Sequence, residues 1–208
     1  MPDLGTDTKS KKMTQIALFG TSADPPTSGH ETIIKWLSQN FDKVIVWASD
    51  NPFKSHKIPL KQRSAMLSIL IENIDSNKNN ISLNSELSSR RTIETVEGAR
   101  KKWHNAEFTL VVGSDLVKQL PNWYKIEELL QKVGLLVVPR KGITIEEADL
   151  QKLRELNTGV KIASLEVPDV SSSAYREQGD PAIITPPIKD YIYREHLYKC
   201  QDATIEKV

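Results

Sequence analysis

Two polar clusters, far apart in the chain, carry residue types that handle phosphate. The first, residues 19–30, reads FGTSADPPTSGH and directly follows the apolar run 16–18. An amphipathic stretch comes next, so a strand, a small-residue turn and a helix start fall together, and that geometry aims free backbone N–H groups at a phosphate. The second cluster, residues 170–176, reads VSSSAYR. Together the two clusters predict nucleotidyl transfer.

Thr27 and His30 are the candidate catalytic residues of the first cluster. Their Thr-x-Gly-His spacing places both near the start of the predicted helix, where the helix dipole favours anions and an imidazole can donate to phosphate oxygens. A structural interpretation stands beside this one. Residues 24–26 would form a turn, Thr27 or Ser28 would cap the helix, and His30 would be a surface residue.

The second cluster also predicts an anion site. Asp169 or one of the serines 171–173 can cap a short helix that begins there, and hydroxyl and backbone N–H groups supply donors to phosphate. Arg176 adds a planar cationic fork. The structural alternative is a serine-rich loop that only caps a helix.

The hydrophobic pattern predicts the elements that must position these clusters. Short runs rich in Val, Ile and Leu alternate with segments of helical periodicity, which favours βαβ units and a parallel sheet. The predicted strands are 15–19, 43–48, 81–83, 108–112, 134–138 and 161–165, and the predicted helices are 31–39, 60–72, 93–102, 126–131, 146–156 and 188–196. The expected fold class is therefore α/β, a Rossmann-like open parallel sheet with helices on both faces.

In such sheets ligands bind outside the carboxyl ends of the strands. The notable polar residues follow predicted strand ends, and we expect them to converge on one crevice. They are residues 20–30, 49–57, 113–115, Arg140 and 171–176.

Composition narrows the functional classes. The chain has 208 residues, 38% of them hydrophobic, and 28 Lys and Arg against 27 Asp and Glu, for a net charge of +1. We expect one domain over residues 13–200, a disordered leader over 1–12 with Met13 as an alternative start, and a frayed end over 201–208. The charge balance argues against a nucleic-acid partner, and any phosphate recognition should be local.

Cysteine and histidine usage argues against a metal site of the protein's own. Cys200 is the only cysteine, and the four histidines are scattered, so neither a disulfide nor a zinc cluster is expected. No apolar segment is long enough for a signal peptide or a membrane span. We expect a cytoplasmic protein without a membrane partner.

On these motifs the chain resembles the nucleotidyltransferase superfamily marked by the His/Thr-x-Gly-His signature, and within it the bacterial nicotinate-nucleotide adenylyltransferases. Residues 20–30 match the family's Gly-Gly-Thr-Phe-Asp-Pro-x-His-x-Gly-His, and residues 170–176 match its Ile-Ser-x-Thr-x-x-Arg. Three shorter stretches agree with it as well, namely 91–95, 112–115 with Trp123, and 187–198. The resemblance runs from about Met13 to Tyr198.

The chain departs from the family pattern both in the first cluster and in a later loop. Thr27 replaces the more usual first histidine, and Ala23 replaces a common Phe. Residues 51–57 read NPFKSHK where the family usually has Asn-x-Pro-Pro-His-Lys. That altered loop bears on which pyridine nucleotide is accepted.

The resemblance implies that the phosphate of nicotinate mononucleotide attacks the α-phosphorus of ATP, giving the dinucleotide deamido-NAD and pyrophosphate in NAD biosynthesis. No enzyme nucleophile is needed, and Mg²⁺ would accompany ATP. The alternatives are nicotinamide mononucleotide as acceptor, another adenylyl or cytidylyl acceptor such as phosphopantetheine, a non-catalytic nucleotide sensor, and, last, a fragment of an aminoacyl-tRNA synthetase. A homo-oligomer is compatible with all of them.

The resemblance also assigns site residues. Thr27 and His30 would hold the transferring and leaving phosphates, and Arg176 would complete the catalytic set. The residues implied to bind ATP are Gly20, Thr21, Ser22, Gly29, Gly113, Asp115, Ser172 and Ser173. Those implied to bind the mononucleotide are Lys57, Thr92 and Trp123.

Structural interpretations remain open for several of these positions. Residues 113–115 also fit a strand-end turn with a helix cap, and Trp123 fits core packing, the default for Trp36, Trp47 and Trp103. Lys57 and His56 also fit solvated loop charges. Arg63 is interpreted as a surface residue in a salt bridge, and Arg140 either reaches the triphosphate or belongs to a plain turn.

Overall fold

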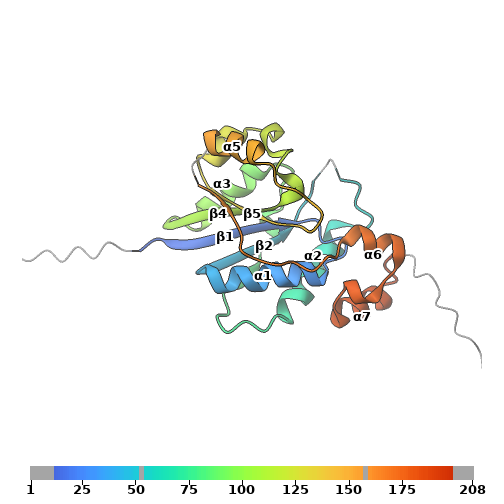
Figure 1. The fold of residues 1–208 in the computed structure, drawn as a ribbon. Helices are drawn as coiled ribbons and strands as arrows, with labels where there is room; N and C mark the ends of the chain where they lie inside the picture. Colours follow the sequence, from blue (N-terminus) through green and yellow to red (C-terminus); the bar gives the residue numbers. More distant parts are fainter. Residues whose placement is uncertain (1–11, 52–53, 157–158, 199–208) are drawn as a thin grey trace, which may run out of the picture.

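The computed structural model describes residues 12–51, 54–156 and 159–198, and their centre is a six-stranded sheet (Figure 1). The strands are β1 (Thr14–Thr21), β2 (Lys43–Ala48), β3 (Ile81–Leu83), β4 (Ala106–Gly113), β5 (Gly134–Val138) and β6 (Val160–Ile162). Every pairing is parallel, and the order is β3-β2-β1-β4-β5-β6. The order reverses between β1 and β4, so a topological switch point lies there. The predicted fold class is confirmed.

Helices cover both faces of the sheet. They are α1 (Ser28–Asn40), α2 (Leu60–Glu72), α3 (Thr92–Lys102), α4 (Ile126–Leu130), α5 (Glu147–Leu156), α6 (Ser172–Gln178) and α7 (Pro186–Arg194). One core joins the sheet to α1, α2 and α7, and the other joins it to α3, α4 and α5. Figure 1 shows α1 and α2 on one side of the strands and α3 and α5 on the other.

The central strand β1 shows how the sequence builds these two cores. Ala17 and Phe19 face the core of α1, α2 and α7, while Ile16 and Leu18 face the opposite core. None of the four is more than 6% exposed. Because side chains alternate along a strand, a strand covered on both faces reads as an unbroken apolar run.

The predicted element boundaries lie within two residues of the observed ones, except at two places where they differ by three residues for physical reasons. Helix α1 begins at Ser28 rather than at residue 31, because Thr27 is its extended N-cap. Strand β6 ends at Ile162 rather than at residue 165. The Ala163 N–H still donates to the Val137 carbonyl at 2.8 Å, and the chain then leaves the sheet. Residues 1–11 of the predicted leader, Cys200 and the predicted frayed end lie outside the described residues.

Helix α6 lies beside the turn that follows β1, although the two are far apart in sequence. Its Ser172 hydroxyl donates to the Pro25 carbonyl at 2.7 Å. Figure 1 shows α6 and α7 together at one end of the strands. The two polar clusters of the sequence therefore meet next to the carboxyl end of β1.

Candidate active site

The side chain of His30 is fixed by hydrogen bonds at both ring nitrogens. The Thr27 N–H donates to Nδ1 at 3.0 Å, and the Thr27 hydroxyl lies 2.9 Å from the same nitrogen. Since Nδ1 accepts, the proton belongs on Nε2, which lies 2.8 Å from the Thr21 hydroxyl. The network therefore holds a neutral imidazole with an Nε2–H donor beside the end of β1.

The surroundings of His30 keep its ring neutral. Burial lowers the pKa of His30 to about 3, and the positive charges of Arg140 and Lys54 add to the effect. The residue is only 8% exposed, so the interpretation of His30 as a surface residue is wrong. Thr27 does cap α1, as the structural interpretation held, and capping here also orients the imidazole.

The glycines of the first cluster have packing reasons for being glycine. A Cβ on Gly20 would lie 2.5 Å from the ring of Trp47, which is itself buried. A Cβ on Gly29 would lie 3.3 Å from both Val167 and Val170. Gly29 therefore lets the segment before α6 close onto the start of α1, which brings the second cluster to the first.

Arg176 and Ser172 of the second cluster both donate hydrogen bonds to the turn of the first cluster. Arg176 donates to the Asp24 carbonyl at 2.5 Å and to the Ser173 hydroxyl at 2.9 Å. The Ser171 hydroxyl caps α6 by accepting from the Ala174 N–H at 3.0 Å. The cluster is thus both a helix cap and a donor group, and it lies against residues 24–25.

Arg63 is buried, and its interpretation as a salt-bridged surface residue is wrong. It is 1% exposed, and it donates to the carbonyls of Ile58, Ser22 and Ser49 at 3.1, 2.7 and 2.9 Å. Burial lowers the pKa of Arg63, and Asp24 opposes that shift. Arg63 ties the turn after β1 to the chain after β2.

Lys57 contacts the site through its backbone. Its N–H donates to Asp24 Oδ2 at 2.7 Å, while its side chain is exposed. The neighbouring His56 has Nδ1 4.0 Å from the same carboxylate oxygen. Burial, followed by the charge of Arg63, lowers the pKa of His56. Residues 52–53 of this altered loop lie outside the described residues.

A second polar group follows β4 and β5. Asp115 Oδ1 lies 3.3 Å from Arg140 Nε, and the Arg140 N–H donates to the Ser114 hydroxyl at 3.0 Å. A Cβ on Gly113 would collide with Asp115 Oδ1 and lie 3.0 Å from Arg140 Nε. Gly113 thus leaves room for the ion pair, and the charge of Arg140 reaches His30.

Thr92 and Trp123 lie on the α3 side of the sheet. Thr92 is the first residue of α3, and Trp123 is half-buried against the core of α3, α4 and α5. Their neighbours Arg91 and Tyr124 stack, with the guanidinium 3.9 Å from the ring centroid. The structure therefore brings these two segments together on the α3 side of the sheet. Trp36, Trp47 and Trp103 pack in or against the cores, as predicted.

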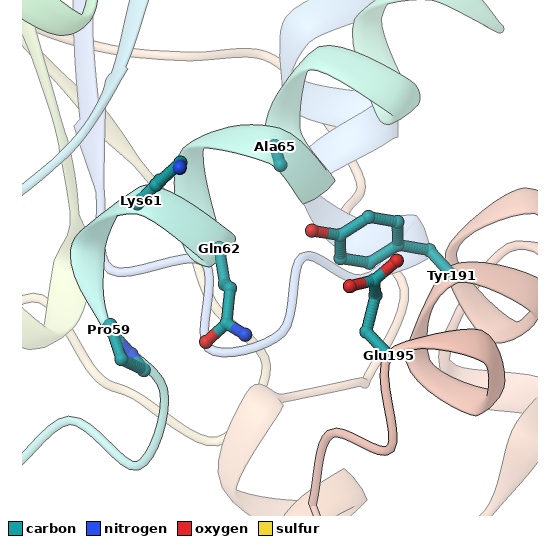
Figure 2. A pocket seen from close by; sticks show the side chains of 6 residues that line it. All are labelled: Pro59, Lys61, Gln62, Ala65, Tyr191 and Glu195. Atoms are coloured by element: carbon teal, nitrogen blue, oxygen red, sulfur yellow. The ribbon is translucent and has the colours of Figure 1, made fainter.

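Within the described residues no group of three or more His, Cys, Asp or Glu could hold a metal ion. A pocket between α2 and α7 lies elsewhere on the molecule (Figure 2). It is lined by Pro59, Lys61, Gln62, Ala65, Tyr191 and Glu195, and it contains none of the predicted site residues. In the part of the chain that the structure covers, no helix has the length and apolar character needed to span a bilayer.

The fold and site define a nucleotide-binding α/β protein of the nucleotidyltransferase class. The defining features are the parallel sheet with its switch point, the helix start after β1, and the Arg176 guanidinium at residues 24–25. The cytidylyltransferase-like family model matches residues 18–178, and the chain belongs to that family. The match contains both polar clusters.

Two relatives with similar sequences carry the same name. A Synechocystis sp. protein named probable nicotinate-nucleotide adenylyltransferase is 40% identical over 198 residues, covering 89% of this chain and 99% of its own. A Bacillus cereus protein of the same name is 30% identical over 203 residues, covering 90% and 100%. The fold is shared with Plasmodium falciparum nicotinic acid mononucleotide adenylyltransferase complexed with NaAD, at a TM-score of 0.75, 23% identity, and 89% and 97% coverage.

Proposed function

We propose that this protein transfers the adenylyl group of ATP to nicotinate mononucleotide, forming deamido-NAD and pyrophosphate in NAD biosynthesis. The observation that carries the proposal is the neutral His30 at the start of α1, held at Thr27 and Thr21 beside the docked second cluster. The names of the Synechocystis and Bacillus relatives agree with this acceptor. The corresponding location for this step of NAD biosynthesis is the cytoplasm.

The reaction needs no covalent intermediate with the protein. The phosphate of the mononucleotide attacks the α-phosphorus of ATP, the bond to the β-phosphate oxygen breaks, and pyrophosphate leaves. The protein's task is to align two polyanions and to stabilise the charge that develops on the transferring and leaving phosphates. His30 suits that task because its imidazole is neutral and carries its proton on Nε2. The Nε2–H can therefore donate a hydrogen bond to a phosphate oxygen.

Different groups of residues would hold the two substrates. Thr27, His30 and Arg176 would contact the reacting phosphates, with Ser172 and Ser173 beside them. Gly113 and Asp115 would bind the adenosine ribose, because a carboxylate accepts from sugar hydroxyls. Thr92 and Trp123 would bind the pyridine nucleotide, the indole by stacking. Lys57 would contribute through the backbone N–H that orders Asp24.

Mg²⁺ belongs to this proposal as part of the MgATP substrate. The described residues offer no carboxylate cluster for the ion, and Mg²⁺ prefers substrate phosphate oxygens with several waters to a protein cage. Its chemistry there would be to neutralise charge on the phosphates.

The test is pyrophosphate release by the purified protein with MgATP and one acceptor at a time. Nicotinate mononucleotide, nicotinamide mononucleotide and phosphopantetheine form the three parallel arms. We expect turnover with nicotinate mononucleotide at a kcat/KM at least tenfold above the other two. A higher kcat/KM with nicotinamide mononucleotide would show that this compound is the acceptor. No pyrophosphate release in any of the three arms, with ATP still bound, would favour a nucleotide sensor.

A further inference from the structure

The last described residue of the chain reaches back to the first polar cluster. The Tyr198 hydroxyl donates to Asp24 Oδ1 at 2.7 Å across 174 positions of sequence. Asp24 is 3% exposed, and burial, with the bond to Asp24, raises the pKa of Tyr198. The contact is therefore a hydrogen bond from a neutral phenol to a buried carboxylate.

The backbone before Tyr198 is shaped to make this contact. Helix α7 ends in a Schellman arrangement, in which the His196 N–H bonds to the Tyr193 carbonyl and the Leu197 N–H bonds to the Ile192 carbonyl. His196 has φ +50 and Tyr198 has φ +58, a region that residues with a side chain seldom adopt. Such conformations persist when surrounding contacts hold them, and Leu197, buried in the α7 core, is one of those contacts.

The other end of the contact is a turn held in the same uncommon region. Ala23 has φ +46. The flanking Ser22 carbonyl accepts from Arg63, and the Asp24 carbonyl accepts from Arg176. The second oxygen of the Asp24 carboxylate accepts from the Lys57 N–H. Four residues thus fix one turn, and among the described residues Tyr198 and the Lys57 N–H are the donors to its carboxylate.

We infer that Tyr198 is a positioning residue for the nucleotide site, acting through Asp24 on the turn that precedes Thr27 and His30. Without the hydroxyl, a buried carboxylate oxygen loses its donor, and a desolvated acceptor with no partner favours a rearranged turn. A rearranged turn would misplace the Asp24 carbonyl on which Arg176 rests. The inference rests on the proposed function insofar as the ligand of this turn is ATP.

The deciding variant is Tyr198→Phe, with Tyr193→Phe as the matched control. Tyr193 is 55% exposed on α7, so the control removes the same hydroxyl from a ring away from the turn. The binding probe is α,β-methylene-ATP with Mg²⁺, followed by titration calorimetry. The expected result is a dissociation constant raised fivefold or more in Tyr198→Phe and changed less than twofold in Tyr193→Phe.

Steady-state kinetics separate positioning from general destabilisation. Loss of folded protein lowers the apparent maximal rate and leaves KM unchanged, whereas a misplaced turn raises KM for ATP and spares KM for the mononucleotide. An increase in dissociation constant below fivefold, or a fall in maximal rate alone, overturns the inference. A wild type that binds the analogue but transfers to no pyridine mononucleotide overturns the proposed function only, because the binding comparison still stands.

Hydrogen exchange on the wild type covers the case in which Tyr198→Phe does not fold. Coupling between two sites is reciprocal, so the bound analogue should slow amide exchange at residues 195–198 as well as at residues 22–30. Protection confined to residues 22–30 overturns the inference. A wild type that does not bind the analogue overturns both proposals together.

Discussion

Replacement of His30 by glutamine should remove a defined part of the acid sensitivity of the fold. The folded pKa of His30 is about 3, against about 6.5 in an unfolded chain. Protons therefore bind His30 in the unfolded state but not in the folded state between these two values. The stabilisation from a neutral His30 is fully present above pH 6.5 and is lost as the pH falls toward 3.

The magnitude follows from the two pKa values. Between pH 7 and pH 5 this linkage removes about 2 kcal/mol from the free energy of unfolding. A glutamine side chain does not titrate, so the His30→Gln variant lacks this contribution to the pH dependence. His56, whose pKa is also lowered, is present in both proteins and cancels when their free energies are subtracted.

Urea unfolding of the wild type and of His30→Gln at pH 7, 6 and 5 measures the effect. We expect the variant to be the less stable protein at pH 7, because the Thr27 N–H loses its acceptor. The stability difference should then shrink by about 2 kcal/mol at pH 5. Parallel curves, with a constant difference from pH 7 to pH 5, would show that His30 is not held neutral by its surroundings.

Four further substitutions test the site and its packing. His30→Ala should lower kcat by about 10²–10³ with little change in either KM, and unchanged pyrophosphate release would exclude its role. Arg176→Lys keeps the charge but loses the fork, so kcat/KM for ATP should fall by about tenfold or more; full activity would contradict the clamp. Trp123→Ala should raise KM for the mononucleotide by about tenfold while kcat changes little, and an unchanged KM would return Trp123 to the core. Gly20→Ala places a Cβ 2.5 Å from Trp47 and should cost about 1–3 kcal/mol, or roughly 2–12 °C in thermal midpoint; an unshifted midpoint would refute the packing argument.

The sheet and the first cluster could be predicted because their signals are local. Apolar runs fix the strands, and a helix start directly after a strand places Thr27 and His30 without knowledge of the rest of the chain. The burial of His30 could not be predicted in this way. Its hydrogen bonds with Thr27 and Thr21 form only when the turn after β1 is folded. The end of β6 was also missed, because only the loss of pairing beyond Ala163 ends that strand.

Arg63 and Tyr198 could not be assigned by such local reasoning. The partners of Arg63 are backbone carbonyls, which leave no trace in sequence, and the partner of Tyr198 lies 174 positions away. One signal for Arg63 was available. It precedes Met66, Leu67 and Leu70 by three, four and seven positions, so it lies on the apolar face of its helix. A cation on that face predicts a buried charge with dedicated acceptors.

The positive charge at this site comes from the placement of individual side chains and not from an excess over the whole chain. The net charge is only +1, yet the charges of Arg140 and Lys54 add to the effect of burial in lowering the pKa of His30. Arg63 and Arg176 are anchored on backbone carbonyls, and Arg140 is paired with Asp115. Groups held in this way need little reorganisation when phosphate charge develops, which is the condition under which fixed donors stabilise a transition state best. A polyanionic nucleotide bound at this turn would therefore meet side chains that are already oriented.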